Sequence, residues 1–146
     1  MEAVIGNLLQ KQVSPEAMAE LVPIIASIGS DHYITTVANQ AVKKPMTDEG
    51  FQKLIESLGG LVDSDHYLSQ FLQTALERPN LSKQNIITVL NATSRIDSDH
   101  YVTEVLTEAA PIIKSMNDSS LKDAYRVAAK KIESETYYGR VLRAID

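Results

Sequence analysis

Four residues, Ser-Asp-His-Tyr, occur in this order three times in the 146-residue chain, at Ser30–Tyr33, Ser64–Tyr67 and Ser98–Tyr101. A fourth, altered copy occupies Ser134–Tyr137 and reads Ser-Glu-Thr-Tyr. The first serines of consecutive copies are separated by 34, 34 and 36 residues. Self-similarity at such a period is typical of proteins built from stacked helical units, because no single unit can bury its apolar face alone. The sequence therefore predicts a stack of helical repeats.

Apolar side chains recur at fixed distances from each serine and follow the period of a helix. An apolar residue lies two positions before each serine, and a valine or phenylalanine lies seven positions after it. In three copies an alanine lies eleven positions after the serine, where a small side chain lets neighbouring helices approach closely. This pattern predicts a helical hairpin with its short turn at each copy. The positions are Ile28, Val62, Ile96 and Ile132, then Val37, Phe71, Val105 and Val141, then Ala41, Ala75 and Ala109.

We expect an all-α fold in a single domain, an α-solenoid of about four stacked helical hairpins plus an N-terminal helix over residues 2–12. The expected repeats cover approximately residues 14–45, 46–79, 80–116 and 117–146. Self-standing solenoids usually carry polar capping repeats, and neither end of this sequence shows one clearly. We therefore expect the chain to be a fragment of a longer protein.

Composition limits the classes of function. The net charge is -5 and no run of Lys or Arg exceeds two residues, which argues against a nucleic-acid surface. No stretch of about 18 apolar residues occurs, so we expect no membrane insertion by this segment. There are no cysteines, which excludes disulfides and thiolate chemistry. A cytoplasmic or a bacterial periplasmic location fits equally well.

The residues of the repeated phrase have structural roles at a helix start. Serine is a favoured N-cap, and an aspartate in the first turn faces the positive end of the helix dipole. We expect the tyrosines to pack between repeats, with each hydroxyl reaching a partner. As an acid–base pair the aspartates are too regular and too far apart. The repeat-defining set is Ser30, Asp31, Tyr33, Ser64, Asp65, Tyr67, Ser98, Asp99, Tyr101 and Tyr137.

All three histidines, His32, His66 and His100, occupy the same position of the phrase, directly after an aspartate. Packed helices lie roughly 8–10 Å apart, so one zinc ion could join two neighbouring histidines at most. The simplest interpretation is an exposed first-turn residue that was copied with its neighbours. We expect no catalytic residue, no cofactor and no metal site. The alternative is a metal- or pH-sensing domain that uses this Asp-His series.

The phrase Ile/Val-x-Ser-Asp-x-Tyr-x3-Val-Leu resembles HEAT-like helical repeats of bacterial α-solenoids. Some of those follow a BlaR-like membrane-anchored peptidase or an anti-sigma region. The resemblance covers residues 14–146 and implies a helical-repeat architecture without catalytic residues. The tetratricopeptide repeat shares the 34-residue period, but its Trp, Leu-Gly and Ala-x3-Phe positions are absent here. The His-Glu-x-x-His motif of a metallopeptidase is absent too.

The second helix of each expected hairpin has an outward face that is polar and carries little charge. Stacked repeats often bind partners along such an extended surface. We therefore expect a non-catalytic protein–protein interaction or scaffold module of a larger bacterial protein, with a protein or peptide partner. A purely structural spacer is the other alternative. The candidate interaction residues are Thr36, Asn39, Gln40, Ser69, Gln70, Gln73, Thr103 and Thr107.

Overall fold

The computed structural model describes residues 15–27 and 29–146, which form eight α-helices and one short 3-10 helix. No strand occurs in this part of the chain, so the predicted all-α class is confirmed. The helix expected over residues 2–12 lies outside the described residues, as do Ile28 and the side chain of Met18. The helices are α2 (Pro15–Ala26), α3 (Asp31–Val42), α4 (Asp48–Leu61), α5 (Asp65–Leu76), α6 (Lys83–Ala92), α7 (Asp99–Met116), α8 (Ser119–Ala129) and α9 (Glu135–Ile145), with η1 (Thr93–Arg95) following α6.

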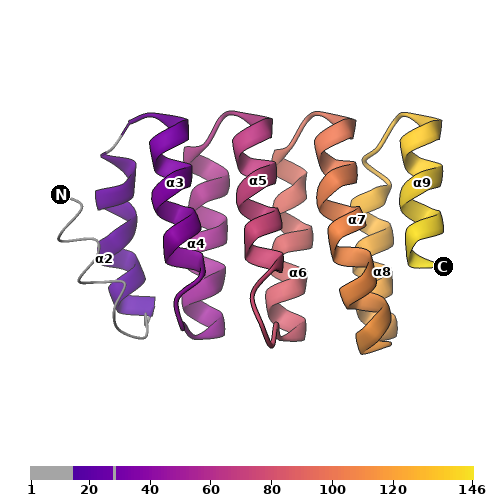
Figure 1. Ribbon diagram of the computed structural model, residues 1–146, viewed down its shortest axis with the longest axis horizontal. Helices are drawn as coiled ribbons and strands as arrows, with labels where there is room; N and C mark the ends of the chain where they lie inside the picture. Colours follow the sequence, from indigo (N-terminus) through magenta and orange to yellow (C-terminus); the bar gives the residue numbers. More distant parts are fainter. Residues whose placement is uncertain (1–14, 28) are drawn as a thin grey trace.

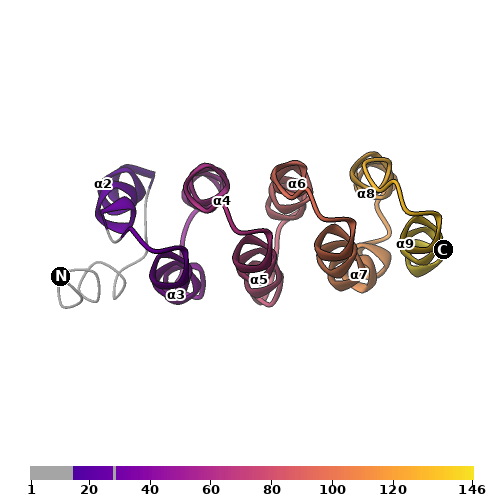
Figure 2. The same cartoon turned by 90° about the horizontal axis from the view of Figure 1, so that it is seen from above.

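The helices lie in two rows (Figure 2). One row contains α2, α4, α6 and α8, here called the even row, and the other contains α3, α5, α7 and α9, the odd row. Each helix packs against the next member of its own row as well as against its sequence neighbour. The turns that lead from an even-row helix into an odd-row helix lie along one edge of the molecule, the upper edge in Figure 1. The turns in the other direction lie along the opposite edge. We call these the turn edge and the far edge.

Each copy of the repeated phrase begins an odd-row helix. The serine is the N-cap residue, and the following aspartate or glutamate is the first helical residue. The Oγ atoms of Ser64 and Ser134 accept hydrogen bonds of 3.3 Å from the backbone N–H groups of Tyr67 and Tyr137. The serines that precede α3 and α7 make no such side-chain bond. The predicted helix starts are therefore correct, while the serine cap bond forms at only two of the four copies.

The apolar positions defined by the repeat form the interior. The residues two positions before the serine are buried at Val62, Ile96 and Ile132, and Phe71 is fully buried seven positions after it. Full burial of such a side chain contributes about 1.5–3 kcal/mol. The three alanines are completely buried, as expected for close contacts between neighbouring helices: Ala41, Ala75 and Ala109.

Two prolines lie inside helices without ending them. Pro23 lies within α2, and α7 continues past Pro111 as far as Met116. Asn117 then adopts the left-handed conformation, with φ 50°, and ends α7. This conformation is tolerated better by asparagine than by most residues other than glycine, which explains its use at this turn.

The last two helices are joined by a buried tyrosine that does not belong to the repeated phrase. The hydroxyl of Tyr125 in α8 donates a hydrogen bond of 2.7 Å to the carbonyl oxygen of Val141 in α9. The side chain is fully buried, and burial raises the pKa of its hydroxyl above the ordinary value. The hydroxyl therefore stays protonated and keeps its donor role in alkaline solution.

Candidate functional site

At the turn edge, each aspartate of the phrase binds the backbone of the next turn along the chain. The Oδ2 atom of Asp31 accepts hydrogen bonds from the backbone N–H groups of Asp63, at 3.2 Å, and Ser64, at 2.9 Å. We call this arrangement the carboxylate clamp. It recurs with nearly the same distances: Asp65 to Asp97 and Ser98, 3.2 and 2.9 Å, and Asp99 to Glu133 and Ser134, 3.1 and 2.9 Å.

The clamp gives the aspartate a second role that the sequence reasoning missed. The expectation assigned Asp31 and its counterparts to the positive end of their own helix, and they do lie in its first turn. The same carboxylate also satisfies two backbone donors of another turn, and hydrogen bonds to an ionised acceptor are stronger than neutral ones. Each clamp thus joins two odd-row helix starts. The offset of 32–35 residues from acceptor to donor follows the spacing of the phrase, but the donors are backbone N–H groups that no residue type marks.

The rings of the phrase form a second series along the same edge. The centroid of His32 lies 5.2 Å from that of Tyr33 and 5.7 Å from that of Tyr67, so one histidine contacts tyrosines of two turns. His66 and His100 repeat the arrangement. The ring planes are inclined by 58–66°, close to the edge-to-face geometry that aromatic pairs favour. We call the series the aromatic ladder, and its seven rings are, in spatial order, Tyr33, His32, Tyr67, His66, Tyr101, His100 and Tyr137.

Exposure differs between the two kinds of ring. The three histidines are exposed. Tyr67, Tyr101 and Tyr137 are half-buried and pack against the core, in agreement with their expected place between repeats. For Tyr33 the expected packing is wrong, because 60% of its surface is exposed. The ladder is therefore a surface feature whose tyrosines are partly fixed by the interior.

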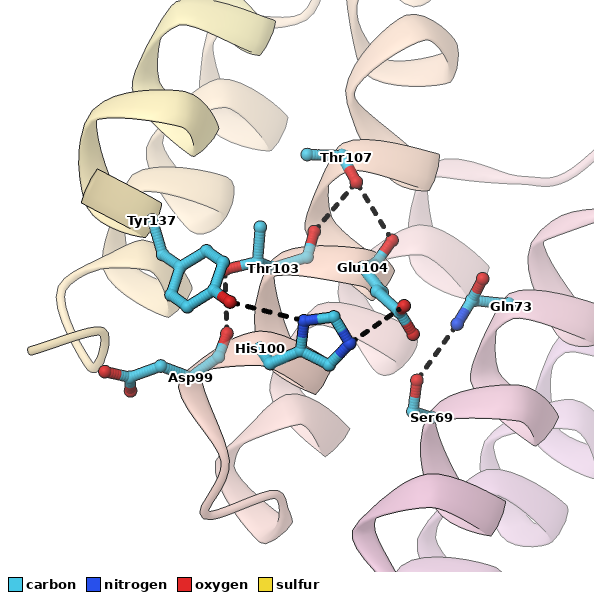
Figure 3. Close-up of polar contacts among 8 residues, drawn as sticks. All are labelled: Ser69, Gln73, Asp99, His100, Thr103, Glu104, Thr107 and Tyr137. Atoms are coloured by element: carbon cyan, nitrogen blue, oxygen red, sulfur yellow. Dashed lines mark hydrogen bonds and ion pairs between the residues drawn. The ribbon is translucent and has the colours of Figure 1, made fainter. Parts of the chain in front are cut away.

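Polar contacts hold the last part of the ladder (Figure 3). The hydroxyl of Tyr137 lies 3.5 Å from Nδ1 of His100, across the space between α9 and α7. On the other side of the same imidazole, Nε2 lies 3.2 Å from Oε1 of Glu104. The expected partner of a tyrosine hydroxyl is thus present here as a histidine.

The imidazole rings of the ladder do not converge on one point. A tyrosine ring lies between each histidine and the next in the series. Across residues 15–27 and 29–146 the structure contains no group of three or more His, Cys, Asp or Glu side chains placed to hold a metal ion. The side chains of the phrase instead pack against one another along the turn edge.

The eight candidate interaction residues do not all reach the surface. Thr36, Gln40 and Gln70 are exposed, whereas Asn39, Gln73 and Thr107 are half-buried. Two of the eight, Ser69 and Thr103, are buried, so their side chains cannot contact a partner.

Both buried residues are used inside their own helices (Figure 3). Ser69 Oγ accepts a bond of 2.9 Å from Nε2 of Gln73. Thr103 Oγ1 donates to the carbonyl oxygen of Asp99 at 2.7 Å, and Thr107 Oγ1 donates to that of Thr103 at 2.8 Å. The outward surface is therefore narrower than the sequence pattern suggested, and it is centred on α3 and α5.

None of the helices in the described part of the chain combines the length and the apolarity needed to cross a bilayer. No family model, no curated protein and no solved structure matches the chain. The inference of function therefore depends on the residues themselves.

Proposed function

We propose that the chain is an α-solenoid of HEAT-like repeats and acts as a non-catalytic protein–protein interaction or scaffold module of a larger bacterial protein. The arrangement in two rows, with a recurring turn on one edge, supports the repeat architecture. It provides a long and regular outer surface instead of one deep site, and such surfaces suit an extended protein or peptide partner.

The observation that carries the proposal is the uncharged polar surface of α3 and α5. Thr36, Gln40 and Gln70 are exposed there and combine hydroxyl and amide groups. Amides both donate and accept hydrogen bonds, so this surface can pair with a backbone of any sequence. On the even row, the groove between α4 and α6 is lined by one acid, Glu56, and one base, Arg95.

Site-specific photo-crosslinking in the bacterium of origin tests the proposal. A photoreactive amino acid would replace Gln40 or Gln70 on the odd row, or Gln84 on the even row, which is equally exposed. We expect one shared partner from the first two positions and none from Gln84. No product at any position would indicate a spacer and overturn the proposal, as would equal products at all three.

A pair of matched double variants then measures the contribution of the surface. Gln40→Glu with Gln70→Glu adds two charges to the proposed surface, whereas Gln84→Glu with Asn91→Asp adds two charges at exposed positions of α6. We expect the first pair to reduce capture of the identified partner about tenfold, because each buried unpaired charge at an interface is costly. The second pair should leave capture unchanged.

A further inference from the structure

The aromatic ladder lies in an acidic environment. The turns before α5, α7 and α9 carry carboxylates, and those of Asp63, Asp97, Glu133 and Glu135 are exposed. The clamp aspartates add further negative charge, since only the Oδ2 atom of each takes part in the clamp. Of the basic groups near this edge, Arg95, Lys130 and Lys131 follow even-row helices, whereas Arg140 lies in the odd-row helix α9. The odd-row side combines aromatic rings with negative charge.

The chain itself places a cation on one ring of this surface. The guanidinium carbon of Arg140 lies 5.3 Å from the centroid of Tyr137, within the range of a cation–π contact. Arg140 is three residues after its tyrosine in α9. The same position after the other ladder tyrosines holds Thr36, Gln70 and Glu104, so no intrachain arginine is available there. Like Tyr137, Tyr33 contacts a single imidazole, and its ring is the most exposed of the ladder tyrosines. Tyr67 and Tyr101 each contact two imidazoles and keep only part of their surface exposed.

We propose that the aromatic ladder binds an extended basic segment of a partner protein, with a lysine or arginine at every third residue. Each cation would lie against one of Tyr33, Tyr67 and Tyr101 and close to the carboxylates of the adjoining turn. This surface adjoins the uncharged one, since Thr36 and Gln70 lie three residues after Tyr33 and Tyr67. The tests below change no residue of the uncharged surface, so either proposal can fail without the other.

The spacing of the rings determines the spacing of the cations. The rings of Tyr67 and Tyr101 are linked through His66 by separations of 5.2 and 5.7 Å, so their centroids lie within about 11 Å of each other. An extended segment in the polyproline II conformation rises 3.1 Å per residue and advances about 9 Å in three residues. Such a segment presents one side chain per turn on the same side, in register with one tyrosine per helix.

The first test uses two synthetic peptides of equal composition. One has five Arg-Ser-Ser triplets, and the other has five contiguous arginines flanked by ten serines. Fluorescence anisotropy at low ionic strength would measure their dissociation constants for the chain. We expect the spaced peptide to bind about fivefold more tightly, because only it can place a cation on each ring. Equal affinities, or tighter binding of the contiguous peptide, would overturn the proposal in favour of nonspecific attraction.

Matched charge variants separate the ladder from the net charge. Asp63→Asn with Asp97→Asn removes two exposed carboxylates beside the rings, and the backbone N–H groups that the clamps use stay in place. Glu49→Gln with Glu77→Gln removes the same charge at exposed positions of the far edge. We expect at least a fivefold loss for the first pair and less than twofold for the second. Equal losses would contradict binding at the ladder.

The ring itself is tested at its most exposed member. Tyr33→Leu keeps an apolar side chain but removes the aromatic face, and Tyr138→Leu makes the same change at a half-buried tyrosine outside the ladder. We expect the spaced peptide to bind about threefold more weakly to the first variant only. Unchanged binding to Tyr33→Leu would exclude a ring contact at that position.

Discussion

The turn edge and the far edge both tie successive layers of helices together, but they do so in different ways. At the turn edge, one set of residue types is used three times, and the donor–acceptor distances agree within 0.1 Å from clamp to clamp. At the far edge, Ser82 Oγ and Asn85 Nδ2 both donate to Asp48 Oδ1 at 3.1 Å, and within the described helices that arrangement occurs once. Repetition of residues is thus not required for layers to be joined.

The difference lies in whether the same contact recurs from one copy to the next. A histidine of the ladder contacts rings of two turns, and a clamp aspartate serves both its own helix and the next turn. Because these contacts recur, a middle copy is joined on both sides: the N–H group of Ser64 donates to Asp31, and the adjacent Asp65 accepts from Ser98. At the far edge, Arg78 donates to the carbonyl oxygens of Val42 and Lys44, so this contact joins the end of α5 to the end of α3. Contacts that do not recur, such as those of Arg78, allow the far edge to use different residues between different pairs of helices.

The largest expected effect comes from breaking the middle clamp. Asp65→Ala removes the acceptor for the N–H groups of Asp97 and Ser98, as well as the first-turn charge of α5. We expect a loss of about 2 kcal/mol in the free energy of unfolding, measured by urea denaturation, because bonds to a charged group are lost together.

Glu135 provides the matched control for that variant. It occupies the same first-turn position in α9, is exposed, and makes no clamp within the described residues. Glu135→Ala should therefore cost less than about 0.5 kcal/mol, which is the value of a first-turn charge alone. Equal losses for the two variants would show that the dipole contact, and not the clamp, stabilises the turn edge.

The second prediction concerns the far edge. The guanidinium of Arg78 lies 5.5 Å from the Phe51 ring, donates to two carbonyl groups, and has a pKa lowered by burial and partly restored by Asp48. Arg78→Met keeps the aliphatic stem and removes the donors. We expect a loss of about 1 kcal/mol in the same urea assay.

The loss of stability in Arg78→Met should be confined to α3, α4 and α5, the helices joined by the contacts of Arg78. Hydrogen exchange of α7–α9 should be unchanged in Arg78→Met, because the arginine contacts only earlier segments. Faster exchange throughout the chain would show that the far edge transmits its effects as far as the turn edge does.

The aromatic ladder should contribute less to the free energy of unfolding than the Asp65 clamp or the Arg78 contacts. His66→Ala removes ring contacts with Tyr67 and Tyr101 at an exposed position, and we expect a loss of about 0.5–1 kcal/mol in thermal or urea unfolding. His66→Phe keeps an aromatic ring at this position and should therefore retain most of the stability that His66→Ala loses.

The same melting experiment bears on the metal-sensing alternative. Zinc and EDTA should each leave the melting temperature unchanged, because a tyrosine ring separates His66 from the neighbouring histidines. A zinc-dependent increase that disappears in His66→Ala would contradict this expectation.

These contrasts also explain which features the sequence could predict. Helix starts at the four copies and the burial of Ala41, Ala75 and Ala109 follow from local spacing and side-chain size. The clamp could not be read from one copy, because Asp31 already has a sufficient local role at its own helix start. Its partner is a pair of backbone N–H groups, which every residue except proline carries, so no residue type marks it.

The outward surface was predicted less well for a related reason. Ser69 and Thr103 are polar and follow the phrase at the expected offset, yet both are buried. The hydroxyl of Ser69 accepts a hydrogen bond from the Gln73 side chain, and that of Thr103 donates one to the carbonyl oxygen of Asp99. Because both hydroxyls are hydrogen-bonded, their burial costs little. Polarity alone could not distinguish these two residues from Gln70, which is exposed. The helical period shows which residues share a face of the helix, but neighbouring positions on that face can differ in exposure.

The smallest effect is a pH dependence at the far edge, where Asp118 caps α8. The Ser120 hydroxyl and then the Leu121 N–H, which both donate to this carboxylate, lower its pKa from 3.8 to about 2. Because the folded-state pKa is depressed, the contribution to stability is complete above pH 3.8 and is lost as the pH falls towards 2. Asp118→Asn mimics the protonated side chain. The melting temperatures of the variant and the parent should therefore differ slightly at pH 5 and converge near pH 2, whereas the three clamp aspartates are unchanged in both proteins and cancel in the comparison. A constant difference across this range would mean that the charge of Asp118 contributes nothing to the far edge.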